Sequence, residues 1–98
     1  MDISVKVVKT GKAILVAACD CELLGKNLKF GKIEFPVRKD FYEGEILGVD
    51  EVLKTIMTGT TVNLLGERVV GHALKAGLVH PDAVLYVSGI PHAMIMKL

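Results

Sequence analysis

Residues 61–78 read TVNLLGERVVGHALKAGL, and this stretch decides the fold. The apolar positions of its second half recur three and four residues apart, which is the spacing of one face of an α-helix. These positions are Leu65, Val69, Val70, Ala73 and Leu74. Arg68, His72 and Lys75 fall on the opposite face. The stretch therefore predicts the end of a buried strand that runs directly into a helix.

Both ends of this helix carry capping signals. Asn63 stands at the junction with the strand, where its side chain is placed to accept from the first free backbone N–H groups. The helix is expected to start near Gly66. Gly77 is placed to end it in a left-handed conformation, with Leu78 folding back onto the apolar face.

A hairpin is predicted at the start of the chain. Ile3, Val5 and Val7 alternate with polar residues, as in a half-buried strand. Residues 13–19 are apolar without alternation, which is typical of a strand covered on both faces. Because the turn signal at residues 10–12 is short, we expect the two strands to pair directly.

The segment after the hairpin is less regular. Asp20 is predicted to cap a single helical turn over residues 21–24. Residues 28–37 predict a strand. Since proline cannot donate to a ladder, Pro36 indicates that this is an edge strand.

The middle of the chain predicts one irregular segment and one helix. Residues 40–48 are expected to be irregular, with Phe41 and Tyr42 turned inward. Asp50 is then expected to cap a helix that ends at Gly59.

The remaining strands complete the predicted fold. Strands are expected over residues 60–62, 83–88 and 93–98, with a turn over residues 89–92. The order of strands and helices is that of crossover units, so the strands at 60–62 and 83–88 should run parallel and the outer strands antiparallel. We predict one domain over residues 1–98. Its class is α+β (mixed α/β), with a mixed sheet of about five to six strands and two main helices.

Composition excludes few functions. With 12 basic and 11 acidic residues the net charge is +1, so no global field attracts nucleic acid or a membrane. The hydrophobic fraction of 51% argues against disorder. So much apolar surface in a small chain also suggests a homodimer.

Three observations bear on location. The longest apolar run, residues 13–19, is too short to span a bilayer. The first residues alternate and carry charge, so they do not resemble a signal peptide. Cys19 and Cys21 are too close in sequence for an ordinary structural disulfide. A reducing cytoplasm is therefore expected.

Four short stretches, taken together, resemble a known family. They are CDCELLGK (19–26), FYEGE (41–45), NLLGER (63–68) and GIPHA (89–93). In this order, over essentially the whole chain, they resemble an archaeal family catalogued as domain of unknown function 424. The resemblance implies an archaeal, cytoplasmic protein with a shared surface, and it implies no activity, cofactor or catalytic residue. The position of Cys21 varies in the family pattern, which argues against a Cys-x-Cys motif.

Several motif residues mark a candidate ligand site. They are Asp20, Glu22, Asn63, Gly66, Glu67, Arg68, Pro91 and His92. Asp20, Asn63 and His92 each follow a different predicted strand. If those strands run parallel, their loops meet at one sheet edge, where open α/β sheets bind ligands. The helix start at Gly66 adds free N–H groups and a positive dipole end, which suit a phosphate or carboxylate.

Each of these residues also has a purely structural interpretation. Asp20 and Asn63 would serve as helix caps. Glu67 and Arg68 would form a solvated surface pair. His92 would bond to backbone groups in its turn. If the strand of residues 13–19 ran antiparallel to the others, the cluster would not form.

The sequence carries no signature of metal or cofactor chemistry. Cys19 is interpreted as a buried, inert thiol. Cys19 and Cys21 do not have the spacing of a zinc site, and no fourth ligand is evident. No nucleophile elbow, P-loop, GxGxxG or HExxH is present. No cofactor and no metal are therefore expected, and enzymatic activity is left open.

Two functional hypotheses follow. The preferred one is a small binding module in archaeal information processing, acting on RNA or a ribonucleoprotein through the basic helix face of Arg68, His72 and Lys75. Its weakness is that only five residues are aromatic, whereas single-strand readers stack bases on aromatic rings. The alternative is a small-molecule-binding protein or enzyme that uses Asp20, Asn63 and His92.

Overall fold

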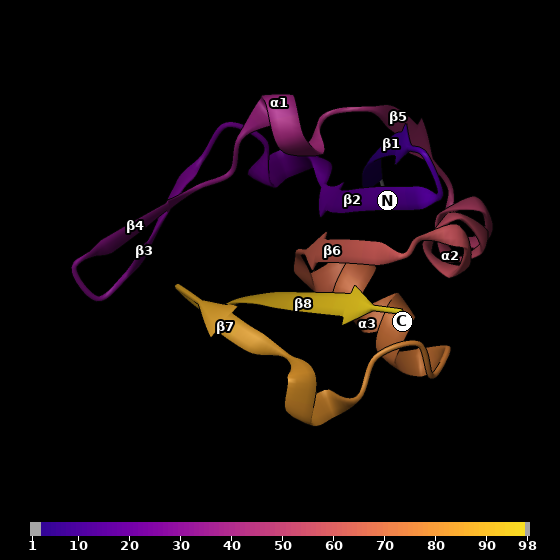
Figure 1. Ribbon diagram of the computed structural model, residues 1–98. Helices are drawn as coiled ribbons and strands as arrows, with labels where there is room; N and C mark the ends of the chain where they lie inside the picture. The colour runs from indigo at the N-terminus through magenta and orange to yellow at the C-terminus, as the bar shows by residue number, and fades with distance from the viewer. Residues whose placement is uncertain (1–2, 98) are drawn as a thin grey trace.

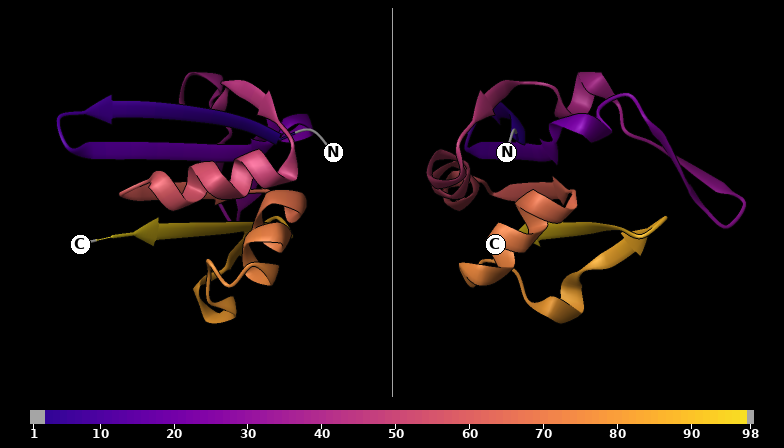
Figure 2. Two further views of the ribbon diagram at one scale, coloured as in Figure 1. Left: turned by 90° about the vertical axis from the view of Figure 1, so that its right-hand side faces the viewer. Right: turned by 180° about the vertical axis from the view of Figure 1, so that it is seen from behind.

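The computed structural model describes residues 3–97, and its centre is a mixed six-stranded sheet with the order β5-β1-β2-β6-β8-β7 (Figure 1). The strands are β1 (Ile3–Thr10), β2 (Ala13–Asp20), β5 (Glu45–Leu47), β6 (Thr61–Leu65), β7 (Leu85–Val87) and β8 (Ile90–Met96). Helices α2 (Val49–Thr58) and α3 (Glu67–Lys75) cover one face of this sheet (Figure 2). The predicted α+β class and mixed sheet are confirmed.

The strand directions agree with the prediction in part. β1 and β2 form the expected antiparallel hairpin, and β2 pairs in parallel with β6. β8 lies between β6 and β7 and runs antiparallel to both. β6 and β7 therefore point the same way, as expected of the strands near residues 60 and 84, but they are not neighbours.

Alternation along β6 sorts its side chains between two cores. Val62 and Leu64 are fully buried on the helix side, where they pack with Val69 of α3. Each such aliphatic side chain contributes roughly 1.5–3 kcal/mol on burial. Leu65 points the other way into a second core. That core consists of Ala17, Cys19, Leu23, Val37, Tyr42 and Leu65.

The helix α3 begins at Gly66 as predicted, but the side chain that caps it is not the predicted one. Its N-cap is Gly66, and Asn63 lies within β6, so the expectation that Asn63 caps the helix was wrong. The cap comes instead from Asp20, 48 residues earlier, whose carboxylate accepts from the backbone N–H of Arg68 at 2.9 Å and of Val69 at 3.0 Å. Asp20, the last residue of β2, thus caps the N-terminus of a helix that is remote in sequence.

The predicted end of α3 is confirmed. Gly77 has a φ of +74°, in the left-handed region. The backbone N–H of Leu78 donates to the carbonyl of Ala73 at 2.9 Å, and Leu78 packs against the helix-side core.

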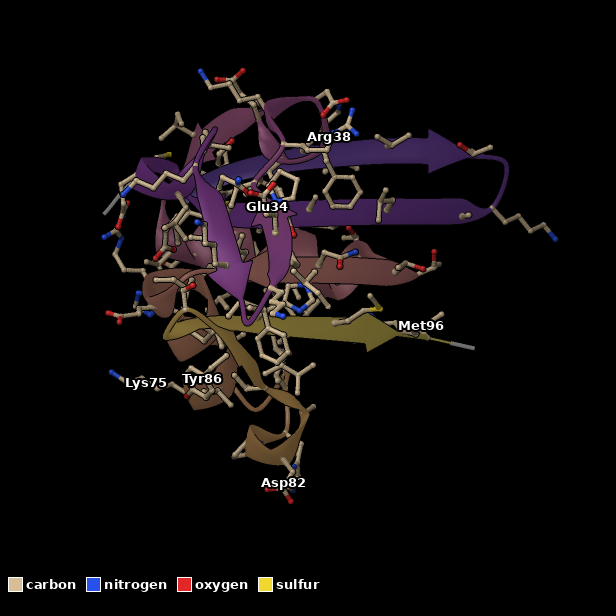
Figure 3. All side chains as sticks on the ribbon, turned by 90° about the vertical axis from the view of Figure 1, so that its left-hand side faces the viewer. Glu34, Arg38, Lys75, Asp82, Tyr86 and Met96 are labelled. Atoms are coloured by element: carbon tan, nitrogen blue, oxygen red, sulfur yellow. The ribbon has the colours of Figure 1, made fainter. Side chains whose placement is uncertain are left out.

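The segment after β2 was predicted incorrectly. Residues 28–37 form no edge strand of the main sheet but a separate antiparallel hairpin, β3 (Asn27–Phe30) and β4 (Ile33–Pro36). Gly31, with a φ of +65°, supplies its turn. The hairpin stands over the sheet face opposite the helices (Figure 3).

Short elements flank this hairpin. Before it, Cys21–Leu23 form the 3₁₀ turn η1, but the Asp20 side chain does not cap this turn because it is engaged with α3. After it, residues 40–48 are more ordered than expected, because they contain most of α1 (Lys39–Tyr42) and all of β5. The predicted inward anchor Tyr42 is buried, and Phe41 is half-buried.

Three further boundaries differ from the predictions. The N-cap of α2 is Gly48, and Asp50 lies in the first turn of the helix, so the expectation that Asp50 caps it was wrong. The end of α2 at Gly59 is as expected. The strand predicted over residues 83–88 is the short edge strand β7, preceded by the 3₁₀ turn η2 (Pro81–Ala83). β8 already starts at Ile90, since the turn is only Ser88 and Gly89, both with positive φ. Within residues 3–97, no helix is long and apolar enough to cross a membrane.

Candidate functional site

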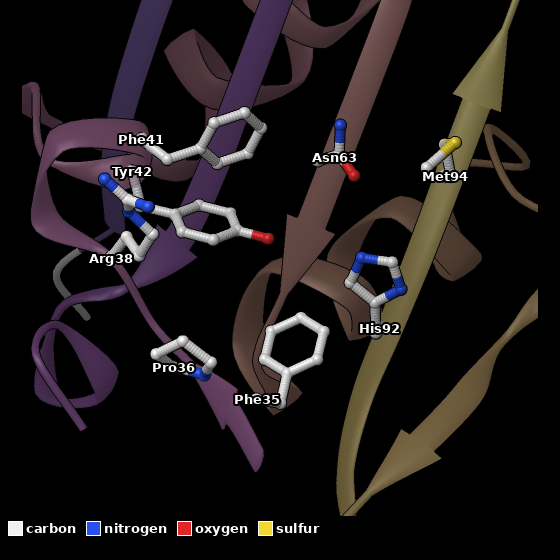
Figure 4. A pocket seen from close by; sticks show the side chains of 8 residues that line it. All are labelled: Phe35, Pro36, Arg38, Phe41, Tyr42, Asn63, His92 and Met94. Atoms are coloured by element: carbon white, nitrogen blue, oxygen red, sulfur yellow. The ribbon is translucent and has the colours of Figure 1, made fainter. Parts of the chain in front are cut away.

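A cavity of about 310 Å³ lies on the sheet face opposite the helices, where β4 and α1 stand over β6 and β8 (Figure 4). We call it the aromatic pocket. It is lined by Phe35, Pro36, Arg38, Phe41, Tyr42, Asn63, His92 and Met94. Its volume is at the lower end of the range for small-ligand sites.

Strand register brings the floor of this pocket together. Asn63 of β6 pairs with Met94 of β8, and Leu65 pairs with His92. Directly paired residues and their neighbours two positions along project from the same face of a sheet. Asn63, His92 and Met94 therefore lie side by side, and the β4–α1 segment supplies the opposite wall (Figure 4).

Three polar side-chain groups of the pocket have no hydrogen-bond partner among residues 3–97. Asn63 is only 9% exposed and Tyr42 only 4%. Among the described residues, neither the Asn63 amide, the Tyr42 hydroxyl nor the His92 imidazole makes a hydrogen bond. The Tyr42 hydroxyl points toward the space flanked by Asn63 and His92 (Figure 4). The three residues line the cavity, and their polar atoms are not enclosed by the protein, so they are available to bond water or a ligand that occupies it.

Burial keeps the pocket uncharged at its centre. It raises the pKa of the Tyr42 phenol to about 12, with Cys19 as a smaller cause. It lowers the pKa of His92, so that the imidazole is neutral at pH 7 and offers one donor and one acceptor. Arg38 is exposed and engages Asp40 through two hydrogen bonds of 2.9 and 2.5 Å.

A second cavity adjoins the aromatic pocket. We call it the hairpin cleft; its volume is about 340 Å³. It is lined by Phe30, Ile33, Phe35, Leu85, Tyr86, Val87 and His92. Phe35 and His92 belong to both cavities and meet edge to face, with ring centroids 5.8 Å apart. The hairpin is tied down at Ser88, whose hydroxyl accepts from the Lys29 backbone N–H at 3.0 Å.

The two cavities together are lined by every aromatic residue of the chain. The sequence has three Phe, two Tyr and no Trp. Phe35, Phe41 and Tyr42 line the aromatic pocket, and Phe30, Phe35 and Tyr86 line the hairpin cleft. The helix-side core is aliphatic. The aromatic rings are thus concentrated on one face.

A third, more polar hollow holds most of the other predicted site residues. Its volume is about 290 Å³, and it is lined by Asp20, Glu22, Leu23, Lys26, Glu67, Arg68 and Ile90. The Arg68 guanidinium pairs with Glu22 and holds the pKa of that carboxyl below its usual value. A Cβ on Gly66 would lie 2.4 Å from the Asp20 Cγ, so the carboxylate itself fills the space at the helix start.

The expected convergence is therefore only partial. Asn63 and His92 share the aromatic pocket, whereas the buried Asp20 side chain lies on the helix side of the sheet. His92 and Pro91 belong to β8 and not to a turn. Pro91 borders a separate hollow beside Glu67.

Sequence reasoning missed part of the pocket. Phe35 and Met94 were not singled out, although each alternates with its neighbours along a strand. Phe41 and Tyr42 were predicted only as packing anchors. On the predicted RNA face, Arg68 is engaged by Glu22, while Lys75 is exposed and His72 half-buried. No group of three or more His, Cys, Asp or Glu residues within positions 3–97 is arranged to hold a metal.

Comparison with known proteins gives a family and a fold relative. A model of the family described as protein of unknown function, DUF424, matches residues 8–98. The chain is similar to the crystal structure of an uncharacterized conserved protein from Methanopyrus kandleri, with a TM-score of 0.83 and 26% sequence identity. The match covers 100% of this chain and 95% of that one. No curated protein matches.

Proposed function

The chain belongs to the DUF424 family, and from the placement of its aromatic side chains we propose that it is a binding module for unpaired bases of RNA. The observation that carries the proposal is that all five aromatic residues line two adjoining cavities on one face. Proteins recognise single-stranded RNA chiefly by stacking its unpaired bases on aromatic rings. Each stacked base contributes about 1–3 kcal/mol.

The exposure of the rings supports this use. Phe30 is 59% exposed and Tyr86 60% exposed, and both line the hairpin cleft. Burying a ring of this size in the core would stabilise the fold, since aromatic side chains bury about 150–250 Å² each. A stacking surface requires the opposite, namely ring faces that remain open to a ligand.

Local charge supports contact with a backbone. The hairpin carries Lys26, Lys29 and Lys32, all exposed. Lysines beside a stacking surface can contact phosphates and release bound counterions. The net charge of only +1 predicts weak binding with a modest salt dependence, because few phosphates are contacted, rather than a high affinity for any duplex.

A small-molecule binder or enzyme is the alternative, and it would use the same pocket. The lining of the aromatic pocket includes Asn63 and His92 but no carboxylate. A neutral imidazole with a lowered pKa and no acidic partner favours binding over acid–base catalysis. A free heterocyclic compound would make the same contacts as an RNA base.

Fluorescence anisotropy with a labelled, unstructured single-stranded RNA tests the proposal. We expect binding at low salt that weakens as salt rises, and weaker binding of a duplex of equal length. Phe35→Leu, which keeps an apolar group but removes the ring shared by both cavities, should lower the affinity about tenfold. Met57→Leu, at an exposed apolar position on α2, is the matched control and should change nothing.

Several outcomes would overturn the proposal. One is the absence of RNA binding at low salt. Another is unchanged binding by Phe35→Leu, together with a loss of binding when His72 and Lys75 are replaced by Glu. Saturable binding of free nucleosides without any affinity for RNA would identify the small-molecule alternative.

A further inference from the structure

We infer that the aromatic pocket selects adenine among the unpaired bases; this rests on the proposed RNA-binding function. The inference comes from the three polar groups that face the cavity without a partner in the described residues: the Asn63 amide, the Tyr42 hydroxyl and the His92 imidazole. Asn63 and Tyr42 are each more than nine-tenths buried as residues, and both line the cavity, so a ligand there can reach their polar atoms. Their chemistry decides which base fits.

The Asn63 amide is the main determinant. It presents a donor and an acceptor side by side, which is the arrangement that pairs bidentately with the exocyclic amine and a ring nitrogen of adenine. The register of β6 with β8 fixes Asn63 beside Met94 and next to His92, so the amide enters the pocket from a rigid strand. A base stacked between the walls of the pocket would meet it edge on.

The other two groups extend the same selection. A tyrosine hydroxyl and a neutral imidazole each offer one donor and one acceptor. Adenine offers its N6 amine as a donor and N1, N3 and N7 as acceptors on different edges, so groups on several sides of the cavity can each find a partner. Uracil carries C–H groups along one edge and would leave part of this set unsatisfied.

The charged groups that favour other bases are not at the centre of the pocket. Guanine is typically read by Arg or Lys, and cytosine by a carboxylate. The lining residues include no carboxylate and no lysine, and the single arginine, Arg38, is exposed and held by Asp40. The pocket therefore lacks the group that would favour either base over adenine.

The test compares RNAs that differ at one base. A labelled run of uridines with a central A, G, C or U is titrated with the wild-type protein, and the A-containing strand should bind about tenfold more tightly than the others. Asn63→Asp replaces the amide donor with an acceptor, so the preference for A should be lost and the strand with C, which donates an amine, should gain affinity.

Tyr42→Phe provides a second variant that retains the ring, in case Asn63→Asp does not fold. It should reduce the preference for A several-fold, whereas Met57→Leu, at an exposed position of α2 that lines neither cavity, should leave it unchanged. The chain has two Tyr and no Trp, so in Tyr86→Phe the remaining tyrosine fluorescence reports Tyr42 alone. Quenching of this fluorescence by the A-containing strand is expected.

The outcomes separate the two levels of inference. Equal affinity for all four strands, or tightest binding of G, would overturn the adenine selection and leave RNA binding standing. A preference for A that survives both Asn63→Asp and Tyr42→Phe would also overturn it. Failure of every strand to bind would overturn the proposed function as well.

Discussion

Replacing Asp20 should destabilise the protein more than any other single change to a charged side chain. Asp20 is 2% exposed, and its carboxylate accepts from the N–H groups of Arg68 and Val69 at 2.9 and 3.0 Å. Asp20→Ala leaves both donors without this acceptor, and one of them belongs to Val69, which is fully buried. It also removes a negative charge from the positive end of α3.

The magnitude follows from these losses. A lost helix cap costs about 0.5–2 kcal/mol, and a buried donor left unsatisfied costs about 1–3 kcal/mol. Because the two estimates overlap, we expect a loss of about 3 kcal/mol in the free energy of unfolding for Asp20→Ala. In a domain of this size that corresponds to a fall in Tm of about 12–24 °C. Asp20→Asn retains one acceptor and should cost about half as much.

Urea unfolding monitored by circular dichroism measures this loss. The matched control is Glu22→Gln, which breaks the exposed pair between Glu22 and Arg68 and should cost less than about 1 kcal/mol. An Asp20→Ala variant that loses no more stability than Glu22→Gln would refute the assignment of Asp20 as the cap of α3.

Three further predictions follow from the same structure. Gly66→Ala should lower the free energy of unfolding by about 3 kcal/mol, because the new Cβ would lie 2.4 Å from the Asp20 Cγ and the φ of Gly66 is +124°. Gly71→Ala in α3, which has open space around it, should raise the free energy of unfolding by about 0.5–1 kcal/mol. Equal effects of the two substitutions in urea unfolding would contradict this prediction. Burial lowers the pKa of His92, so the unfolded state takes up a proton at a higher pH than the folded state, and the free energy of unfolding should fall as the pH drops below about 6.5. His92→Gln should make the free energy of unfolding less dependent on pH in this range. The same pH dependence in the variant and the wild type would show that His92 is not involved. In the Tyr86→Phe variant Tyr42 is the remaining tyrosine, and since burial raises its pKa to about 12, its phenol should stay largely protonated at about pH 10.5. Ionisation of Tyr42 near the usual pKa of about 10 in the folded protein would show that its hydroxyl is accessible to water.

The parts of the fold predicted from sequence are those with strong local periodicity. The β1–β2 hairpin and α3 fall in this class, because alternation and helical spacing persist over whole elements. The two-stranded hairpin was missed because each half of residues 28–37 alternates like a strand, and the change of phase between Phe30 and Ile33 was not taken as a turn. Gly31, with its positive φ, was the signal of a turn. The position of the hairpin depends on a contact that is remote in sequence, the hydrogen bond between Lys29 and Ser88, 59 residues apart.

The candidate site was also predicted only in part, because contacts between residues that are distant in sequence determine it. Local rules expect a helix cap next to the helix, so Asn63 was assigned a role that Asp20 fills from 48 residues away. The start of β8 was placed too late because Pro91 resembled a turn residue. A polar side chain enters the aromatic pocket only if it projects from the right face of its strand. The register of β6 with β8 determines this face, and local sequence does not reveal the register.

The most direct test of the central claim is an NMR titration of isotope-labelled protein with the single-stranded RNA that contains a central A. We predict that the side-chain amide signals of Asn63 and the methyl signal of Met94 shift as RNA is added, while backbone signals of His72 and Lys75 remain in place. Shifts confined to the α3 face, or no shifts at saturating RNA, would contradict a base-binding role for the aromatic pocket.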